Sequence, residues 1–353
     1  MAKTGKYIYG IINSNGEDFS CPNGVTCKGV NTIPYQDISA VVSDSETVVS
    51  DSEIIDYTLL RKEALARELV KYQQIIEEIM PAYAIIPMRL GTFVSDGNEV
   101  REILIRGYRV IKDIFSKIID KIEIDVAATW SDFNSILKEI GEEKEIKELK
   151  DKILANSKEI PVDDRMKVGL MVKKAFDKKR DGCALEIQNA LKTMSEDLKA
   201  HELMDDKMVM NAAFLIRKAS HKDFERKVEE LNTEFAEKLN FRCVGPLPPY
   251  SFYTLEIKRM RGEEIDWAKK KLSLNEFINK NEIKKAYHRA AFFYHPDKNL
   301  DTPGVGMEFN EITRAYKILI DYGEACEQAG HEDNFLLKGE EFRGSALLVK
   351  VKD

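Results

Sequence analysis

The sequence predicts an α+β fold with two mixed domains, a small all-helical hairpin module after them, and a closing C-terminal strand. Short runs rich in β-branched and aromatic residues alternate with amphipathic helical patterns over residues 1–262. Residues 263–325 then show helical patterns only. The apolar run 345–351 is again typical of a strand. Strands and helices interleaved in this way favour sheets covered by a helical layer.

The first domain, residues 1–120, begins with a strand at 6–12 that Asn13-Ser-Asn-Gly16 brings to an end. A long amphipathic pattern from Glu53 predicts a helix that stops at Pro81, because proline cannot continue a helix. The remaining expected elements are strands at 25–33 and 38–43, an apolar segment at 82–94, and a helix at 97–119.

The second domain, residues 121–262, is expected to be rich in helices, with strands from its beginning and its end. We expect strands at 123–130 and 208–216, and helices at 132–154, 166–198 and 222–239. Residues 241–257 read as a strand that a proline-rich bend interrupts, because neither Pro248 nor Pro249 can donate a ladder hydrogen bond.

Residues 258–271 predict a linker or a short helix, and helices then follow to about residue 328. In the tail, 326–353, a loop at 330–339 precedes the closing strand at 345–351. A lone strand is only marginally stable, so we expect it to join the sheet of an earlier domain. The helical module, 263–325, would then be an insertion near the C-terminus.

The composition is that of a globular protein. Of the 353 residues, 43% are hydrophobic and 33% charged, and no apolar run is long enough to span a bilayer. The N-terminal residues do not suggest a secretory signal. Five scattered cysteines suit reduced thiols in a cytosol, and Cys21 and Cys27 lack the further ligands that a zinc site needs. We therefore expect neither a metal nor another cofactor.

The charge is unevenly distributed. The chain has a net charge of −7, but residues 268–300 carry eight Lys or Arg against three acidic residues, a local charge of +5. A basic patch on an acidic protein favours an acidic partner surface over nucleic acid.

Five stretches carry a resemblance to gas vesicle proteins of the L/F type. They occur at the expected order and spacing: Tyr7-Ile-Tyr-Gly-Ile11, Ile38-Ser-Ala-Val-Val-Ser-Asp44, Ile86-Pro-Met-Arg-Leu-Gly-Thr-Phe-Val94, Met210-Asn-Ala-Ala-Phe-Leu-Ile216 and Gly245-Pro-Leu-Pro-Pro-Tyr-Ser-Phe252. The resemblance implies a two-domain protein of ferredoxin-like character. It also implies an accessory or minor structural role in gas vesicles, exercised by binding other vesicle proteins, including the small hydrophobic shell protein, without catalysis.

The residues of these motifs also have structural interpretations. Arg89, between apolar residues, predicts either a buried ion pair that joins two elements or part of a partner surface. Gly91 allows either a turn with positive φ or the close approach of another backbone segment. The segment with Pro246, Pro248, Pro249 and Tyr250 is either an internal turn, which its apolar flanks favour, or a proline-rich ligand for an aromatic groove.

Residues 263–325 resemble a J domain, the module through which Hsp40-type co-chaperones activate Hsp70. The resemblance rests on Tyr294-His-Pro-Asp-Lys-Asn299, between the basic helical run 282–293 and a second helical run that contains Phe309-Asn-Glu-Ile-Thr-Arg-Ala-Tyr-Lys-Ile-Leu319. Pro296 would end the first helix. The expected hairpin core is Ile283, Ala286, Ala290, Phe309, Ile312, Ala315, Tyr316 and Leu319.

The J-domain resemblance also implies the residues that would contact Hsp70. These are the tripeptide His295, Pro296 and Asp297, together with a basic face formed by Lys284, Lys285 and Arg289. Phe293 departs from the family, which usually has a basic residue there. The five histidines form no ligand cluster, so we expect no metal or catalytic role for His295.

Three hypotheses follow. The first is a non-enzymatic gas vesicle assembly protein of the cytoplasm, found at the vesicle, with a J domain that recruits Hsp70. The second is a general co-chaperone whose first domains bind unfolded clients, although the chain lacks a Gly/Phe-rich linker and Cys-x-x-Cys repeats. The third is an enzyme, for which no phosphate loop, nucleophile motif or carboxylate pair was found.

Overall fold

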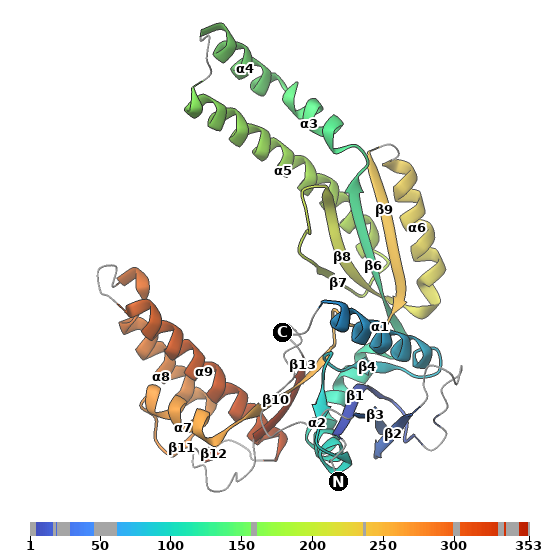
Figure 1. Ribbon diagram of the computed structural model, residues 1–353, viewed down its shortest axis with the longest axis vertical. Helices are drawn as coiled ribbons and strands as arrows, with labels where there is room; N and C mark the ends of the chain where they lie inside the picture. Colours follow the sequence, from blue (N-terminus) through green and yellow to red (C-terminus); the bar gives the residue numbers. More distant parts are fainter. Residues whose placement is uncertain are drawn as a thin grey trace. The chain divides into compact units, whose positions relative to one another are not determined.

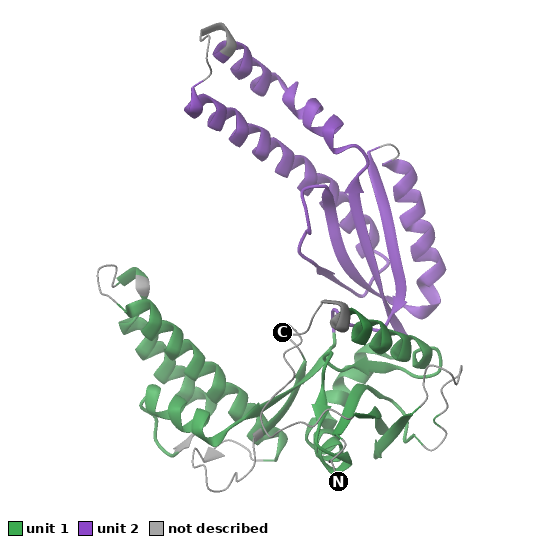
Figure 2. Cartoon of the chain, viewed as in Figure 1, with its two compact units in different colours: residues 1–119, 253–353 green, residues 120–252 purple. Residues whose placement is uncertain are grey.

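The computed structural model divides the chain into two compact units (Figures 1 and 2). Unit 1 consists of residues 1–119 and 253–353, and unit 2 of residues 120–252. The structure describes residues 5–16, 19, 29–45, 62–156, 161–235, 238–298, 304–330, 335–336 and 346–351. It confirms the predicted fold class: mixed α and β domains, helices in the C-terminal region, and a closing strand.

The N-terminal part of unit 1 is an antiparallel sheet packed against a helix. Its elements are β1 (Gly5–Ile12), β2 (Val30–Tyr35), β3 (Ile38–Ser45), α1 (Lys62–Ile79), β4 (Ile85–Pro87), β5 (Phe93–Val94) and α2 (Gly97–Ile118). The strand order is β2-β3-β1-β4, and β5 pairs with β1. The Asp96 carboxylate caps α2 by accepting the backbone N–H groups of Asn98 and Glu99.

A two-stranded ribbon joins this sheet region to the helical module. It consists of β10 (Leu255–Met260) and β13 (Ala346–Val351), which pair antiparallel along their whole length. Successive side chains of a strand point to opposite faces. Leu347 and Val349 therefore enter the core formed by the sheet and α2, whereas Leu348 enters the core of the helical module.

The helical module is a hairpin of α8 (Lys280–Phe293) and α9 (Val305–Gln328), with α7 (Gly262–Lys271) packed against α9. A 3₁₀ turn, Pro296–Lys298, follows α8, and two short strands, β11 (Phe277–Ile278) and β12 (Phe335–Leu336), pair with each other. The buried core contains five of the predicted residues: Ile283, Ala286, Ile312, Ala315 and Leu319. Ala290 and Tyr316 are half-buried against it, and Phe309 is half-buried beside the turn.

Unit 2 has the ferredoxin-like topology. Its elements are β6 (Lys121–Trp130), α3 (Phe133–Gly141), α4 (Lys144–Asn156), α5 (Val162–Lys192), β7 (Asp197–Ala200), β8 (Met208–Arg217), α6 (His221–Glu234) and β9 (Leu239–Leu247). The strands follow the order β7-β8-β6-β9, all antiparallel. Side chains of α5 and α6, such as Ile187, Phe224 and Leu231, pack on one face of this sheet.

Several expected elements differ from those observed. The expected helix at 132–154 is two helices, α3 and α4, and the one expected at 166–198 is α5, which ends at Lys192. The strand β7 follows, because Asp197–Ala200 pairs with the edge of β8. Residues 241–257 supply two strands, one to each unit, so unit 2 ends at Phe252 and not at 262. The expected strand at 25–33 is described from residue 29 onward and is β2, Val30–Tyr35. Residues 53–61 of the first expected helix and most of the expected loop 330–339 lie outside the described residues.

Two glycines give a test of these packing assignments. A Cβ built on Gly107 of α2 would lie 2.9 Å from Cγ1 of Val349 on β13, whereas one built on Gly169 of α5 would meet nothing within 4 Å. We expect Gly107→Val to lower the free energy of unfolding by about 1–3 kcal/mol through overpacking. Gly169→Ala should raise it by about 0.5–1 kcal/mol through helix propensity.

Calorimetry of both variants measures these changes. Equal melting temperatures for wild type and Gly107→Val would contradict the close approach of α2 and β13.

Candidate functional site

The tripeptide His295-Pro296-Asp297 lies in a tight turn at the end of α8. The helix begins at a capping box, in which Asn279 accepts the backbone N–H of Glu282 and Glu282 accepts that of Asn279. It ends where Tyr294 donates its N–H to the Ala290 carbonyl at 3.0 Å. Pro296 cannot supply a helical N–H, so the chain leaves the helix there.

The turn holds the histidine ring in one position. The backbone N–H of Asp297 donates to Nδ1 of His295 at 3.2 Å, and the ring lies edge-on against Phe309 of α9, with 5.5 Å between centroids. The same Nδ1 also lies 3.6 Å from the carboxylate of Asp297. The Asp297 side chain is 86% exposed, so its carboxylate is presented to solvent. The side chain of Pro296 lies outside the described residues.

The predicted basic residues lie on the exposed side of α8. Lys284, Lys285 and Arg289 are all exposed, and none forms an ion pair within the part of the chain that the structure describes. A fourth cation, Lys298, lies in the turn with its Nζ 3.2 Å from the centre of the Phe292 ring. The helix and the turn together therefore present a positively charged surface with an exposed aromatic ring beside it.

Arg89 and Gly91 lie in the turn between β4 and β5. The Arg89 guanidinium is half-exposed and lies 3.4 Å from the buried carboxylate of Glu256 on β10, and the Arg89 backbone N–H donates to the Leu255 carbonyl at 2.7 Å. Gly91 has a φ of 84° and donates its N–H to the Tyr7 hydroxyl at 3.2 Å. Within unit 1, Arg89 thus joins the turn to β10, and Gly91 joins it to β1.

The proline-rich segment connects the last strand of unit 2 to unit 1. Pro246 is exposed at the end of β9, Pro248 and Pro249 are buried, and Tyr250 is half-buried. The N–H of Tyr250 donates to the Pro248 carbonyl at 2.6 Å, which closes a turn. Buried prolines are not accessible to an aromatic groove, so this geometry favours the internal turn.

A buried polar cluster in unit 2 was not predicted. The Glu123 carboxylate on β6 is 1% exposed and accepts the backbone N–H and the hydroxyl of Ser251 at 2.8 and 2.7 Å. The Ser251 hydroxyl also lies 3.1 Å from Nε2 of His201. Burial raises the pKa of Glu123 to about 7 and also raises that of Asp125. In the sequence, the sign of this cluster is that Glu123 and Asp125 occupy alternate positions of an apolar strand. Residues at this spacing lie on one face of a strand.

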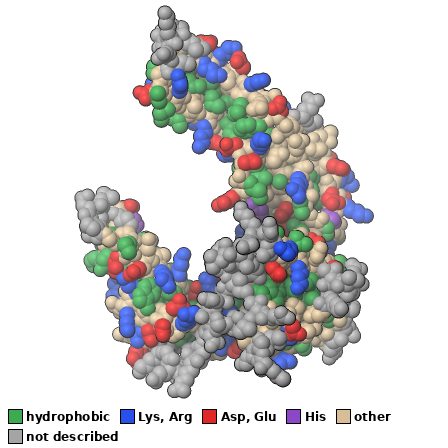
Figure 3. All heavy atoms as spheres, viewed as in Figure 1, with side chains coloured by type: hydrophobic (Ala, Val, Ile, Leu, Met, Phe, Trp, Pro, Cys, Tyr) green, Lys and Arg blue, Asp and Glu red, His purple; other side chains and the backbone are tan. Residues whose placement is uncertain are grey.

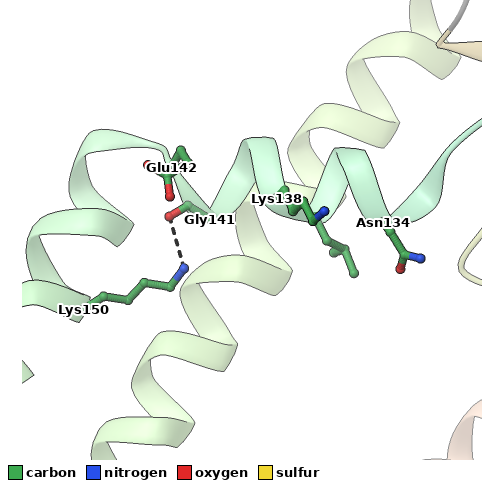
Figure 4. A pocket seen from close by; sticks show the side chains of 6 residues that line it. Asn134, Lys138, Gly141, Glu142 and Lys150 are labelled. Carbon is green, nitrogen blue, oxygen red and sulfur yellow. Dashed lines mark hydrogen bonds between the residues drawn. The ribbon is translucent and has the colours of Figure 1, made fainter. Parts of the chain in front are cut away.

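The described residues also contain a surface hollow on two helices of unit 2. An open hollow of about 690 Å³ on α3 and α4 has Lys150 at one end, donating to the Gly141 carbonyl at 3.2 Å (Figure 4). No His, Cys, Asp and Glu group among the described residues is arranged to hold a metal, and no described helix could cross a membrane. Cys21 and Cys27 lie outside these residues.

Comparisons with known proteins match two successive parts of the chain. Residues 5–254 match the family model "Gas vesicle synthesis protein GvpL/GvpF", and residues 270–324 match the DnaJ domain. Gas vesicle protein F of Microcystis aeruginosa is 22% identical over 71% of this chain and 98% of that relative. The chaperone protein DnaJ of Lysinibacillus sphaericus is 44% identical over 64 residues, 18% of this chain and 17% of that relative.

A comparison with solved structures also finds the fold of a gas vesicle protein. The crystal structure of the gas vesicle protein GvpF from Anabaena matches with a TM-score of 0.59 and 20% identity, covering 70% of this chain and 98% of that one. The fold and the turn define a two-unit α+β protein that carries a J domain before its last strand. The chain belongs to the GvpL/GvpF family of gas vesicle synthesis proteins, and its J domain occupies residues 270–324.

The buried Glu123 predicts a pH dependence of the stability of unit 2. Below about pH 4.5 the carboxyl is protonated in the folded and the unfolded chain. As the pH rises from 4.5 to 7, the unfolded chain loses the proton and the folded chain keeps it, so stability falls by roughly 3 kcal/mol in total. Glu123→Gln should remove this fall, so the variant gains on the wild type between pH 5 and pH 8.

Denaturant unfolding at pH 5 and pH 8 measures this difference. The chain has two tryptophans, so on a Trp267→Phe background the fluorescence of Trp130 reports on unit 2 alone. A stability difference between the wild type and Glu123→Gln that is the same at both pH values would contradict the raised pKa.

Proposed function

We propose that this protein is a non-enzymatic gas vesicle assembly factor of the cytoplasm that binds other vesicle proteins and brings Hsp70 to them. The observation that carries the proposal is the presence, in one chain, of a nearly complete GvpL/GvpF region and a J domain with its His-Pro-Asp turn intact. The small hydrophobic shell protein is the proposed client. Such subunits aggregate easily, so an Hsp70 recruited at the assembly site would keep them soluble.

The geometry of the turn supports the Hsp70 half of the proposal. His295 is fixed by its backbone hydrogen bond and by Phe309, while the Asp297 carboxylate is exposed beside it. Lys284, Lys285 and Arg289 lie exposed on the preceding helix. Positive charge of this kind would speed the encounter with an acidic Hsp70 surface. Phe293, 71% exposed where the family usually has a basic residue, removes one charge from this face.

The alternative, a general co-chaperone, shares the J domain but needs a different client region. Residues 5–254 match a gas vesicle family. This match favours vesicle proteins as the clients over unfolded proteins in general. Suppression of the aggregation of unrelated denatured proteins would support the alternative.

The first prediction concerns Hsp70 activation. The wild-type chain should stimulate the ATPase of an Hsp70 from the same source, and His295→Gln and Asp297→Asn should each return the rate to the basal level. Both variants remove a group from the turn and leave the hairpin core unchanged. Arg289→Glu should lower the stimulation several-fold, because it reverses a charge on the docking face. Steady-state ATPase assays measure all three.

Two substitutions serve as controls. His288→Gln makes the same replacement on an exposed histidine of α8, and Lys317→Glu makes a charge reversal on the exposed side of α9. Both should stimulate as the wild type does. Basal rates for the wild type itself would refute Hsp70 recruitment.

The second prediction concerns vesicle proteins. The full chain, produced together with the shell protein, should retain it on purification, and His295→Gln should retain the same amount. The reason is that binding is assigned to the GvpL/GvpF region and not to the turn. Quantitative pull-down measures both. Failure of the wild type to retain any vesicle protein would refute the assembly function.

A further inference from the structure

The first half of α5 extends beyond the core of unit 2. The buried residues of this helix, Phe176, Ile187 and Leu191, occur from its middle onward, against the sheet and its helices. Before Phe176, the described side chains of the helix pack against the core only while partly buried, as Met171 and Val172 do. Together with α3 and α4 this half of α5 forms a helical arm, on which hydrophobic side chains are exposed between lysines and arginines (Figure 3).

Three large apolar side chains lie exposed on successive turns of this half. Val162, Met166 and Leu170 are 69%, 60% and 66% exposed and are spaced four residues apart. Side chains at this spacing are neighbours on a helix surface, so the three form one continuous ridge. Single exposed apolar residues are ordinary, but a continuous group suggests a surface that a partner covers.

The same ridge becomes basic further along the helix. The next two positions at four-residue spacing are Lys174 and Lys178, both exposed. Neither forms an ion pair with any described residue, although the adjacent Lys179 and Arg180 are paired with Glu139 and Asp177 at 2.7 and 3.1 Å. We call Val162, Met166, Leu170, Lys174 and Lys178 the α5 ridge. Lys174 and Lys178 form no ion pair with a described residue, so their positive charge would attract carboxylates of a partner.

We propose that the α5 ridge is the docking surface for an amphipathic helix of a partner protein, with an apolar patch at one end and carboxylates about two turns further on. A ridge of side chains at four-residue spacing fits the groove between two ridges of another helix. The apolar patch lies on Val162, Met166 and Leu170, and the carboxylates lie opposite Lys174 and Lys178. This proposal rests on the proposed function and names the surface and the kind of segment through which vesicle proteins bind.

A helical occupant suits this surface better than an extended one. An extended peptide gains most of its affinity from backbone hydrogen bonds at the edge of a sheet, whereas the ridge lies on a helix whose backbone groups are already bonded within it. The change from apolar to basic along the ridge also fixes the direction of the bound helix, because reversal places carboxylates on Leu170 and apolar groups on Lys178.

The experiment uses the full chain and two designed helical peptides labelled with fluorescein. Both peptides carry leucines along one face at one end, and two turns further on the first has glutamates where the second has lysines. Fluorescence anisotropy should show binding of the glutamate peptide and at least tenfold weaker binding of the lysine peptide. Leu170→Glu and Lys174→Glu should each weaken binding of the glutamate peptide at least tenfold.

The matched control is Leu69→Glu. Leu69 is 47% exposed on α1 of unit 1, outside the ridge, so its substitution makes the same chemical change and should leave binding unaltered. Circular dichroism of all variants checks that they are folded. Equal affinity for the two peptides, or an equal loss in Leu69→Glu, would overturn the proposal.

Pull-down of vesicle proteins separates this proposal from the proposed function. If the wild type retains the shell protein and Leu170→Glu retains as much, the assembly function stands and the ridge is not its docking surface. If the wild type retains no vesicle protein, the assembly function itself fails. If sedimentation shows that the chain self-associates through the ridge and the glutamate peptide does not bind, the ridge is a contact between copies and the proposal is wrong.

Discussion

The pairing of β10 with β13 is the constraint on which the organisation of unit 1 depends. The ribbon is buried on both sides, since Leu255, Ile257 and Val349 belong to the core of the sheet and α2, while Met260 and Leu348 belong to the core of the helical module. The side chain of Gln328 at the end of α9 adds two hydrogen bonds to the backbone of Val349. The J domain is thus held in the fold at both of its ends and is not attached by one flexible linker.

This attachment has a consequence for the His-Pro-Asp turn. The apolar residues of the hairpin core are used in packing, with Tyr287 stacked on Tyr316 at 4.3 Å. At the far end of the hairpin, Phe292, Phe293 and Met307 are exposed beside basic residues such as Lys298, so the surface there is both basic and apolar. Lys258 and Lys350 both pair with Asp321 of α9 at the end near the ribbon. The structural contacts are concentrated at one end of the hairpin and the proposed Hsp70 contacts at the other, so recruitment need not disturb the fold.

Unit 2 combines a rigid sheet with an extended arm. Its sheet is covered on one face by apolar side chains of α5 and α6, and the opposite side of β6 carries Glu123 and Asp125, whose burial raises the pKa of both carboxyls. Glu123 binds Ser251, two residues before the chain enters unit 1. The arm, in contrast, exposes its apolar ridge. The burial of polar groups and the exposure of an apolar ridge each cost free energy, and the exposed ridge fits the proposal that the protein binds others.

The sequence by itself determined the strands and long helices with regular periods, the hairpin core around Ile283 and Leu319, and the position of the turn at Pro296, because periodicity and proline chemistry act locally. It did not determine that residues 241–257 divide between two units, that Asp197–Ala200 pairs as an edge strand, or that Arg89 meets Glu256. Each of these depends on a partner far away in the chain. The exposure of the α5 ridge and the burial of Glu123 were likewise decided only by the tertiary structure. Similar patterns of apolar and charged residues can face a core or solvent, and only the packing of the other elements settles which.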